Sequence, residues 1–187
     1  LPVLLLNRKN DSRSVSSVTS DNLAGGAAIA DFLLDLGHQQ LAFVAGRDTS
    51  STSRDRETGF RQRLEARGAR PMLRDSGMWS IEEAMNATRR LMALPTPPDA
   101  LFCANDMMAI AALNVVVGEM GMKAGKDISI VGFDDIAMAS WPLINLTTWV
   151  QPLSEMVDTA IAVLKTQLGA AETSAVQHVL QGKRIVR

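Results

Sequence analysis

Short apolar runs alternate with helix-like stretches along nearly the whole chain of 187 residues, and this alternation constrains the fold more than any other feature. Strands and helices that alternate at this spacing are typical of βαβ units, which build a parallel sheet. Because crossover connections are right-handed, helices should cover both faces of that sheet. The chain is therefore predicted to have an α/β fold. The predicted strands are Leu1–Leu6, Val15–Thr19, Leu41–Ala45, Ala100–Ala104, Ile128–Phe133 and Leu146–Val150.

Capping residues indicate where the first two predicted helices begin and end. Asp21 can accept a hydrogen bond from the first amides of a helix, and Gly37 should end that helix because glycine tolerates a left-handed backbone. Thr52 or Ser53 is placed to cap the next helix, which should run to about Arg67. Both helices would then lie between predicted strands, as βαβ units require.

Three later segments carry distinct patterns. Ser80-Ile81-Glu82-Glu83 is a capping box and should open a helix that stops at Pro95. Met107–Met120 is predicted to be a helix that is apolar on nearly every face, so it is either deeply buried or half of an interface. Gln177–Arg187 is interpreted as a hairpin around Gln181-Gly182.

Composition argues against several classes of protein. The net charge of −1 gives no positive surface of the kind that holds nucleic acid. The arginines between Arg54 and Arg70 alternate with acidic residues, which is typical of a solvated helix face. The single cysteine, Cys103, lies in an apolar run and is predicted to be a buried small hydrophobe. No run reaches the roughly 20 apolar residues that span a bilayer, so no membrane partner is expected.

Polar residues follow four of the predicted strands. The pairs Asn7-Arg8, Asn105-Asp106 and Asp134-Asp135 each come directly after a strand, and Gly46-Arg47 leads into a Ser/Thr-rich loop that ends at Arg56. Ligands of open parallel sheets bind outside the carboxyl ends of the strands, so these residues predict a polar crevice. The alternative for each Asn or Asp is that it caps the following helix.

The chemistry of this predicted crevice favours binding of a hydroxylated ligand. Asn105 offers donors and an acceptor, Asp134 accepts, and Arg56 donates in a rigid fork. Vicinal hydroxyl groups of a sugar need such paired donors and acceptors. Trp79 could give a sugar ring an apolar platform, although ordinary packing before a helix is the alternative. The nearby arginines leave a sugar acid or a sugar phosphate open.

Signatures of catalysis, metals and cofactors are weak. His38 follows a helix end and His178 lies in the predicted hairpin, so both are interpreted as structural or exposed. Asp134-Asp135 is a poor metal signature on its own. The glycine pair Gly25-Gly26 lacks the G-x-G-x-x-G fingerprint of a dinucleotide site. We therefore expect no enzyme activity, no metal and no cofactor, and a hydrolase using the two aspartates is the weakest alternative.

A series of motifs, in order from Pro2 to about Gly182, resembles the lactose-repressor (LacI) family of bacterial transcription regulators. Any one of them is a weak signal, whereas the ordered series is highly specific. The motifs are Ser20–Gly26, Leu36–Phe43, Ser53–Arg56 with Gly59-Phe60, Cys103–Ala109, Asp127–Asp135, and Leu146–Thr148 with Gln151-Pro152.

The resemblance implies a type I fold like that of periplasmic binding proteins, with parallel sheets flanked by helices in two lobes and a three-strand hinge. Residues 1–21 would be the last strand of the N-terminal lobe and the first hinge crossing. Residues 22–145 would form a complete C-terminal lobe. Residues 146–187 would return through the hinge and add a helix and terminal strands to the N-terminal lobe, which would be partial.

The resemblance also implies positions for the ligand and for a homodimer interface. By this resemblance the ligand contacts are Asn7, Thr52, Arg56, Trp79, Asn105, Asp134 and Gln151. The dimer contacts are Ser80, Glu83, Ala84, Ile110, Met138, Trp141 and Leu143.

The implied function is that of a cytoplasmic regulator whose small-molecule effector, a sugar, polyol or sugar acid, closes the two lobes. Operator DNA would be bound only through an N-terminal helix-turn-helix, which these residues do not contain, so the chain is expected not to bind operator DNA by itself. A periplasmic sugar-binding protein of a transporter is the alternative, and its cleft would look the same.

Overall fold

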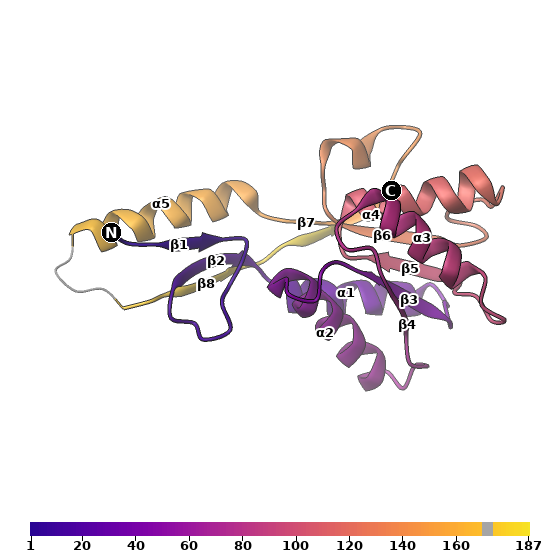
Figure 1. Cartoon of the computed structure of the whole chain (residues 1–187), viewed down its shortest axis with the longest axis horizontal. Helices are drawn as coiled ribbons and strands as arrows, with labels where there is room; N and C mark the ends of the chain where they lie inside the picture. The colour runs from indigo at the N-terminus through magenta and orange to yellow at the C-terminus, as the bar shows by residue number, and fades with distance from the viewer. Residues whose placement is uncertain (170–173) are drawn as a thin grey trace.

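The strands form two sheets that lie in different parts of an elongated molecule (Figure 1). The computed structural model describes residues 1–169 and 174–187. The small sheet has the order β1-β2-β8 and all of its pairs are parallel. The large sheet has the order β4-β3-β5-β6-β7-β9, and only β9 runs antiparallel to its neighbour. The predicted α/β fold with largely parallel sheets is therefore confirmed.

The elements alternate as the apolar pattern predicts. The strands are β1 (Leu4–Leu6), β2 (Ser16–Ser20), β3 (Leu41–Ala45), β4 (Leu73–Ser76), β5 (Ala100–Cys103), β6 (Ser129–Asp134), β7 (Thr147–Val150), β8 (Gln177–Leu180) and β9 (Lys183–Ile185). The α-helices are α1 (Asn22–Asp35), α2 (Ser51–Ala66), α3 (Ile81–Met92), α4 (Asp106–Leu113) and α5 (Leu153–Gly169). Helices α1 and α2 cover one face of the large sheet and α3 and α4 the other, while α5 lies along the small sheet (Figure 1).

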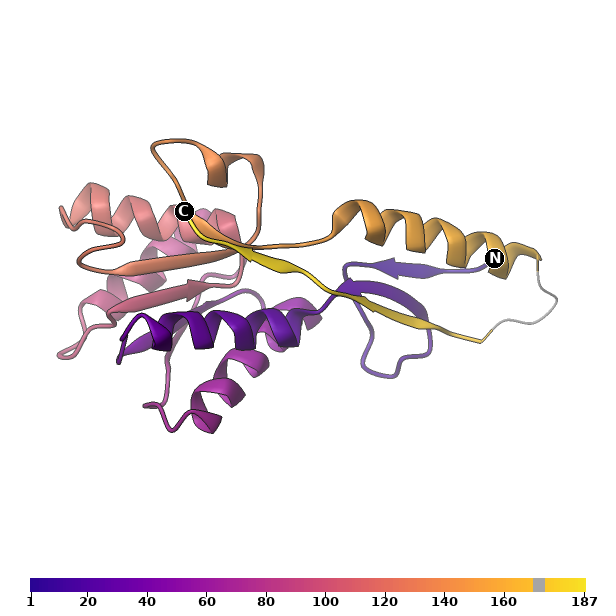
Figure 2. The same cartoon turned by 180° about the vertical axis from the view of Figure 1, so that it is seen from behind.

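Three segments of the chain pass between the two sheets, and both views show them side by side (Figure 2). They join β2 to α1, β7 to α5, and β8 to β9. The interpretation of Gln177–Arg187 as a hairpin is wrong, because β8 pairs with β2 and β9 pairs with β7, in different sheets. Gln181-Gly182 is thus a straight passage rather than a turn. Gly182 lies so close to Trp149 that a Cβ there would be 2.2 Å from the indole nitrogen.

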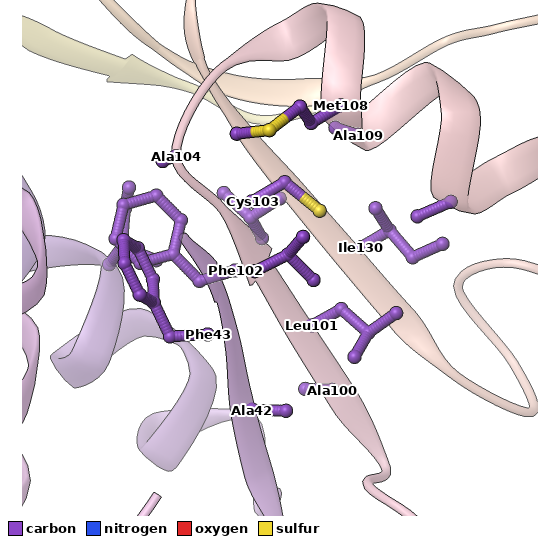
Figure 3. Packing of buried hydrophobic residues seen from close by; sticks show 14 of the residues in the cluster. Ala42, Phe43, Ala100, Leu101, Phe102, Cys103, Ala104, Met108, Ala109 and Ile130 are labelled. Carbon is purple, nitrogen blue, oxygen red and sulfur yellow. The ribbon is translucent and has the colours of Figure 1, made fainter. Parts of the chain in front are cut away.

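Aromatic rings fill the core of the large sheet on its α1/α2 side. The ring centroid of Phe102 lies 5.0 Å from that of Phe43 and 5.2 Å from that of Phe60. Figure 3 shows Phe43 and Phe102 on one side of the strands and Cys103 on the other, near Met108 of α4. Cys103 is fully buried, as predicted, and burial raises the pKa of its thiol. None of the described helices has both the length and the apolar run needed to cross a membrane.

Several predicted boundaries differ in detail. Helix α1 is capped by Asp21 and ends before Gly37, which has a positive φ of 91°, as predicted. Helix α2 begins two or three residues earlier than predicted, because Ser50 and not Thr52 or Ser53 is its N-cap. Ser53 instead accepts a hydrogen bond from the amide of Gly46 at the end of β3, at 3.0 Å.

The other helices differ at one end each. Ser80 caps α3 through the amide of Glu83 at 3.4 Å, and the helix ends at Met92, before the predicted stop at Pro95. The predicted helix Met107–Met120 is α4 followed by a π-helical segment, Asn114–Glu119. Strand β4 carries the sequence LRDS and was not predicted, because it is a polar edge strand without an apolar run.

Candidate functional site

The carboxyl ends of five adjacent strands of the large sheet meet at one edge, where predicted site residues gather. Trp79 follows β4, Asn105 follows β5, Asp134 ends β6 and Gln151 follows β7. The Ser/Thr-rich start of α2 follows β3. Because parallel strands all end at the same edge, the topology alone gathers these side chains, which is where ligands of such sheets bind.

Arg56 lies at the centre of this edge with only 2% of its surface exposed. Its Nε donates to Oδ1 of Asn22 at 2.8 Å, its Nη1 donates to the carbonyl oxygen of Ala104, and its Nη2 lies 3.2 Å from Oδ1 of Asp134. The guanidinium carbon is 3.7 Å from the ring centroid of Phe133. Burial lowers the pKa of Arg56 to about 10, although the charge of Asp134 opposes that shift. The group is therefore a fixed cation at neutral pH.

Asp134 is held from two sides. Besides Arg56, it accepts a hydrogen bond of 2.6 Å from Nε2 of Gln151. Burial raises the pKa of Asp134, whereas the charge of Arg56 and the hydrogen bond from Gln151 lower it. On the other side of Arg56, Asn22 donates to the carbonyl oxygen of Ser20 at 2.9 Å. One buried chain of hydrogen bonds thus connects the end of β2 with the end of β7, two of the three passages between the sheets.

Three of the predicted ligand residues carry buried polar atoms that have no hydrogen-bond partner among the described residues: Oδ1 of Asn7, Nε1 of Trp79 and Oε1 of Gln151. Leaving such an atom unpaired costs about 1–3 kcal/mol, so proteins rarely do it without a reason. Asn7, Trp79 and Asp134 also have positive φ angles of 55°, 60° and 124°. Asn7 and Trp79 combine backbone strain with a polar atom unpaired among the described residues, which favours a site that a ligand completes.

The remaining predicted residues have other contacts in this structure. Asn105 caps α4 through the amide of Met108 at 2.9 Å, so the capping alternative is correct for its oxygen. Its Nδ2 has no partner among the described residues and stays available to a ligand. Trp79 packs over Gly46, where a Cβ would lie 2.3 Å from the indole. Thr52 is 4% exposed and accepts a hydrogen bond from Arg8 at 3.0 Å.

Two residues of the site were missing from the predicted ligand contacts: Arg8, which was predicted only as part of the polar crevice, and Asn22. Arg8 follows Asn7 and reaches from the small-sheet part of the molecule to the first turn of α2. Its position directly after a strand was a usable signal. Asn22, the partner of Arg56, looked like an ordinary first residue of a helix, and only the packing of α1 against α2 reveals its role.

The segment around Arg8 ties the two parts of the molecule together through ion pairs. Nζ of Lys9 lies 2.5 Å from a carboxylate oxygen of Asp55, and Nη2 of Arg54 lies 2.6 Å from Oδ1 of Asp11. The loop after β1 is thus docked on α2.

The neighbouring acidic and histidine residues have structural partners. Asp135 pairs with Arg187 at 2.7 Å. His38 lies at the opposite ends of the strands, where Nε2 is 2.8 Å from Oγ of Ser129. Within residues 1–169 and 174–187, no group of three or more His, Cys, Asp or Glu side chains is arranged to hold a metal ion.

Asp106 lies directly beneath the site and is fully buried. Its two carboxylate oxygens accept hydrogen bonds from Oγ1 of Thr148 at 2.5 Å and from the amide of Ile136 at 2.9 Å. Burial raises the pKa of Asp106 to about 6, against the opposing effect of these hydrogen bonds. Because this pKa lies above the ordinary value of 3.8, the folded state favours the protonated form.

This shift predicts a pH-dependent difference in stability between the parent protein and Asp106→Asn, which cannot ionise. The contribution of Asp106 to the free energy of unfolding should be greatest below pH 4 and should fall by up to about 3 kcal/mol as the pH rises past 6. Urea unfolding of both proteins between pH 4 and pH 7.5 measures the difference. A difference that does not change with pH would contradict the assignment.

Known proteins resemble this chain over most of its length. The family model of the periplasmic binding protein-like domain matches residues 30–187. The probable HTH-type transcriptional repressor ExuR of Bacillus subtilis is 30% identical over 178 residues, which cover 94% of this chain and 53% of the repressor. The chain thus spans about half the length of the curated relatives it matches.

The chain is also similar to solved structures of transcriptional regulators over its whole length. A LacI transcriptional regulator from a Rhodococcus species is 30% identical with a TM-score of 0.91, over 100% of this chain and 69% of that one. The transcriptional regulator CelR in complex with cellobiose is 27% identical with a TM-score of 0.90, over 100% of this chain and 64% of that one.

Proposed function

This chain belongs to the periplasmic-binding-protein-like domains of the LacI family, and we propose that it is the effector-binding and dimerisation part of a transcription regulator. Its ligand would be a small hydroxylated molecule of the sugar class. The observation that carries the proposal is the set of buried atoms on Asn7, Trp79 and Gln151 that are unpaired within the described part of the chain, beside the buried pair of Arg56 and Asp134. The similar CelR structure, a complex with cellobiose, supports the same class of ligand.

The proposed mechanism follows from where these residues lie. Asn7 belongs to the small-sheet part of the molecule, whereas Arg56, Asn105 and Asp134 belong to the large-sheet part. A ligand that contacts both groups would fix the angle between the two parts. Because Gln151 binds Asp134 next to a passage between the sheets, a ligand on Asp134 would act directly on that passage. The angle would then set the affinity of the complete regulator for DNA, with a coupling of about 1–3 kcal/mol that is typical of allosteric proteins.

The proposal is tested with the complete protein. Neutral sugars, polyols and sugar acids are screened by thermal shift, and each hit is followed by calorimetry and by a DNA-binding assay against the promoter regions next to its gene. We expect at least one hit to raise the melting temperature and to change DNA affinity. A protein that responds to none of them would contradict the proposal.

Two other functions receive less support. A transporter-associated binding protein would have a similar site, but the similar proteins described above are regulators. A hydrolase that uses Asp134 and Asp135 would need two available carboxylates, and here each is held by an arginine, Arg56 and Arg187. We therefore propose neither.

The proposed dimer would form through the exposed apolar loop around Trp141 and Leu143, which are 54% and 98% exposed. Ile81 beside Ser80 is also 51% exposed. Ser80, Glu83, Ile110 and Met138 stay in the proposed interface. We leave Ala84 out of the proposed interface, because it is fully buried inside the chain against Gly77.

Leu143→Asp is expected to convert the complete protein from a dimer to a monomer at micromolar concentration, because it would bury a charge in an apolar interface. Light scattering after size-exclusion chromatography measures the mass. The control is Leu168→Asp, at another exposed leucine (64% exposed) near the end of α5 beside the small sheet, which should leave the mass unchanged. A monomeric parent protein, or a variant that stays dimeric, would exclude this interface.

A further inference from the structure

Arg8 has no carboxylate partner among the described residues, unlike the three basic residues nearest to it at this edge. Lys9 is paired with Asp55, Arg54 with Asp11 and Arg56 with Asp134, whereas the polar contacts of the Arg8 side chain within residues 1–169 and 174–187 are two hydroxyl groups. Nη1 of Arg8 donates to Oγ of Ser50 and to Oγ1 of Thr52.

The outward edge of the Arg8 guanidinium is therefore available. Its Nε and Nη2 donors have no partner within the described residues, and the side chain is exposed. These two donors form the parallel fork that binds a carboxylate bidentately. The hydroxyl contacts of Nη1 hold the group in place, so the fork is fixed in orientation before a ligand arrives.

The charged groups around the proposed ligand position also bear on the role of Arg8. Arg8 and Arg56 give two positive charges around the proposed ligand position, and Asp134 gives one negative charge. The charge of Arg8 acts on both neighbours, since it lowers the pKa of Arg56 and of Asp134, in each case as a smaller effect than burial. Asp106 is also nearby and, with a pKa of about 6, carries a negative charge at neutral pH, but it is fully buried and both of its oxygens are occupied by Thr148 and Ile136. The guanidinium of Arg8 is thus not in contact with a carboxylate among the described residues, and a ligand can pair with it directly.

The start of helix α2 adds to this positive character. Ser50, the N-cap, makes no side-chain capping bond, and the first turn of α2 contains no acidic residue. The amide end of a helix behaves like a partial positive charge, and here no side-chain carboxylate within the turn compensates it. Arg8 is bound to this turn through Ser50 and Thr52.

We propose that the effector is a sugar acid whose single carboxylate is bound side-on by Nε and Nη2 of Arg8, an inference that rests on the proposed effector-binding function. The hydroxyl groups of the same molecule would meet the polar atoms of Asn7, Asn105, Asp134 and Gln151. One carboxylate matches the single guanidinium of Arg8. A phosphate monoester carries a charge nearer −2 at neutral pH, which one guanidinium does not neutralise. Arg8 is then the residue that selects an acid over the neutral sugar.

The test measures binding by calorimetry, on the complete protein, of matched pairs that differ only at the acid group. The pairs are glucuronate and glucose, galacturonate and galactose, and gluconate and sorbitol, with glucose 6-phosphate as the phosphate probe. We expect at least one acid to bind roughly ten- to a hundredfold more tightly than its neutral partner, which is the usual effect of a charge-assisted hydrogen bond. In Arg8→Met this preference should fall to near unity, and Arg8→Lys should keep part of it.

The ratio of the affinity for the acid to the affinity for the neutral sugar shows whether Arg8 binds the carboxylate or only holds the loop on α2. If Arg8 only holds the loop on α2, Arg8→Met weakens both members of a pair equally and the inference is wrong. The control Arg61→Met removes an exposed arginine elsewhere on α2 and should leave the ratio unchanged. Melting temperatures confirm that each variant is folded. Tight binding of a neutral sugar without preference for its acid, or preference for the phosphate, overturns the inference while the proposed function stands. No binding of any probe overturns both.

Discussion

Replacing Arg56 with methionine is expected to lower the free energy of unfolding by about 3–5 kcal/mol and to abolish measurable binding of whichever sugar the screen identifies. Methionine fills a similar volume, so the loss would come from charge and hydrogen bonds. The variant leaves the carboxylate of Asp134 buried with Gln151 as its remaining partner. It also removes the donors that serve Asn22 and the carbonyl oxygen of Ala104. Breaking a buried pair in this way costs more than the pair contributes, because a buried charge is left uncompensated.

A double variant separates the loss of stability from the loss of ligand binding. Adding Asp134→Asn to Arg56→Met removes the uncompensated charge, so stability should recover in part while ligand binding stays lost. The control Arg61→Met lies on the same helix with 51% of its side chain exposed, and its effect should stay within about 0.5 kcal/mol. Urea unfolding and calorimetry measure both properties. A single variant as stable as the parent would show that the buried network contributes little, and unchanged affinity would remove Arg56 from the site.

The strands and the place of the site could be predicted because both depend on local sequence. An apolar run followed directly by a polar pair marks the carboxyl end of a strand, and parallel topology then brings such ends together whatever the detailed packing. Asp134 and Asn105 were found in this way. Asn105 also illustrates the weakness of the signal, since the same residue caps α4.

Pairing between distant segments could not be predicted from local pattern. Gln181-Gly182 between two short apolar runs has the sequence of a hairpin, yet β8 and β9 find parallel and antiparallel partners in different sheets. Glycine serves there to let the chain pass Trp149 rather than to turn. In the same way, Asn22 gains its role only because α1 packs on α2, which no spacing within α1 could indicate.

That contact between α1 and α2 gives the second large expected effect, in Gly59→Ala. A Cβ at Gly59 would lie 2.0 Å from the carbonyl oxygen of Leu23 on α1, and a Cβ at Gly26 would lie 2.2 Å from the carbonyl oxygen of Arg56 on α2. Both obstacles are backbone atoms within helices, so neither can move aside without separating the two helices. We expect each alanine variant to lose about 3 kcal/mol of stability or more, at the upper end of overpacking effects.

Helix propensity alone predicts that Gly59→Ala would increase stability, so the measured direction of the change decides between the two effects. Alanine is favoured over glycine inside a helix by about 0.5–1 kcal/mol, so a glycine without close neighbours should gain stability on substitution. Gly118 is such a position, with nothing within 4 Å of its built Cβ, and Gly118→Ala should be neutral or stabilising in urea unfolding. If Gly59→Ala behaved like Gly118→Ala, the helices would not be in backbone contact. The obstacle at Gly26 is the backbone of Arg56 itself, so Gly26→Ala should also displace the guanidinium from Asp134 and weaken ligand binding. Lost stability alone would not lower the ligand affinity of the protein that remains folded.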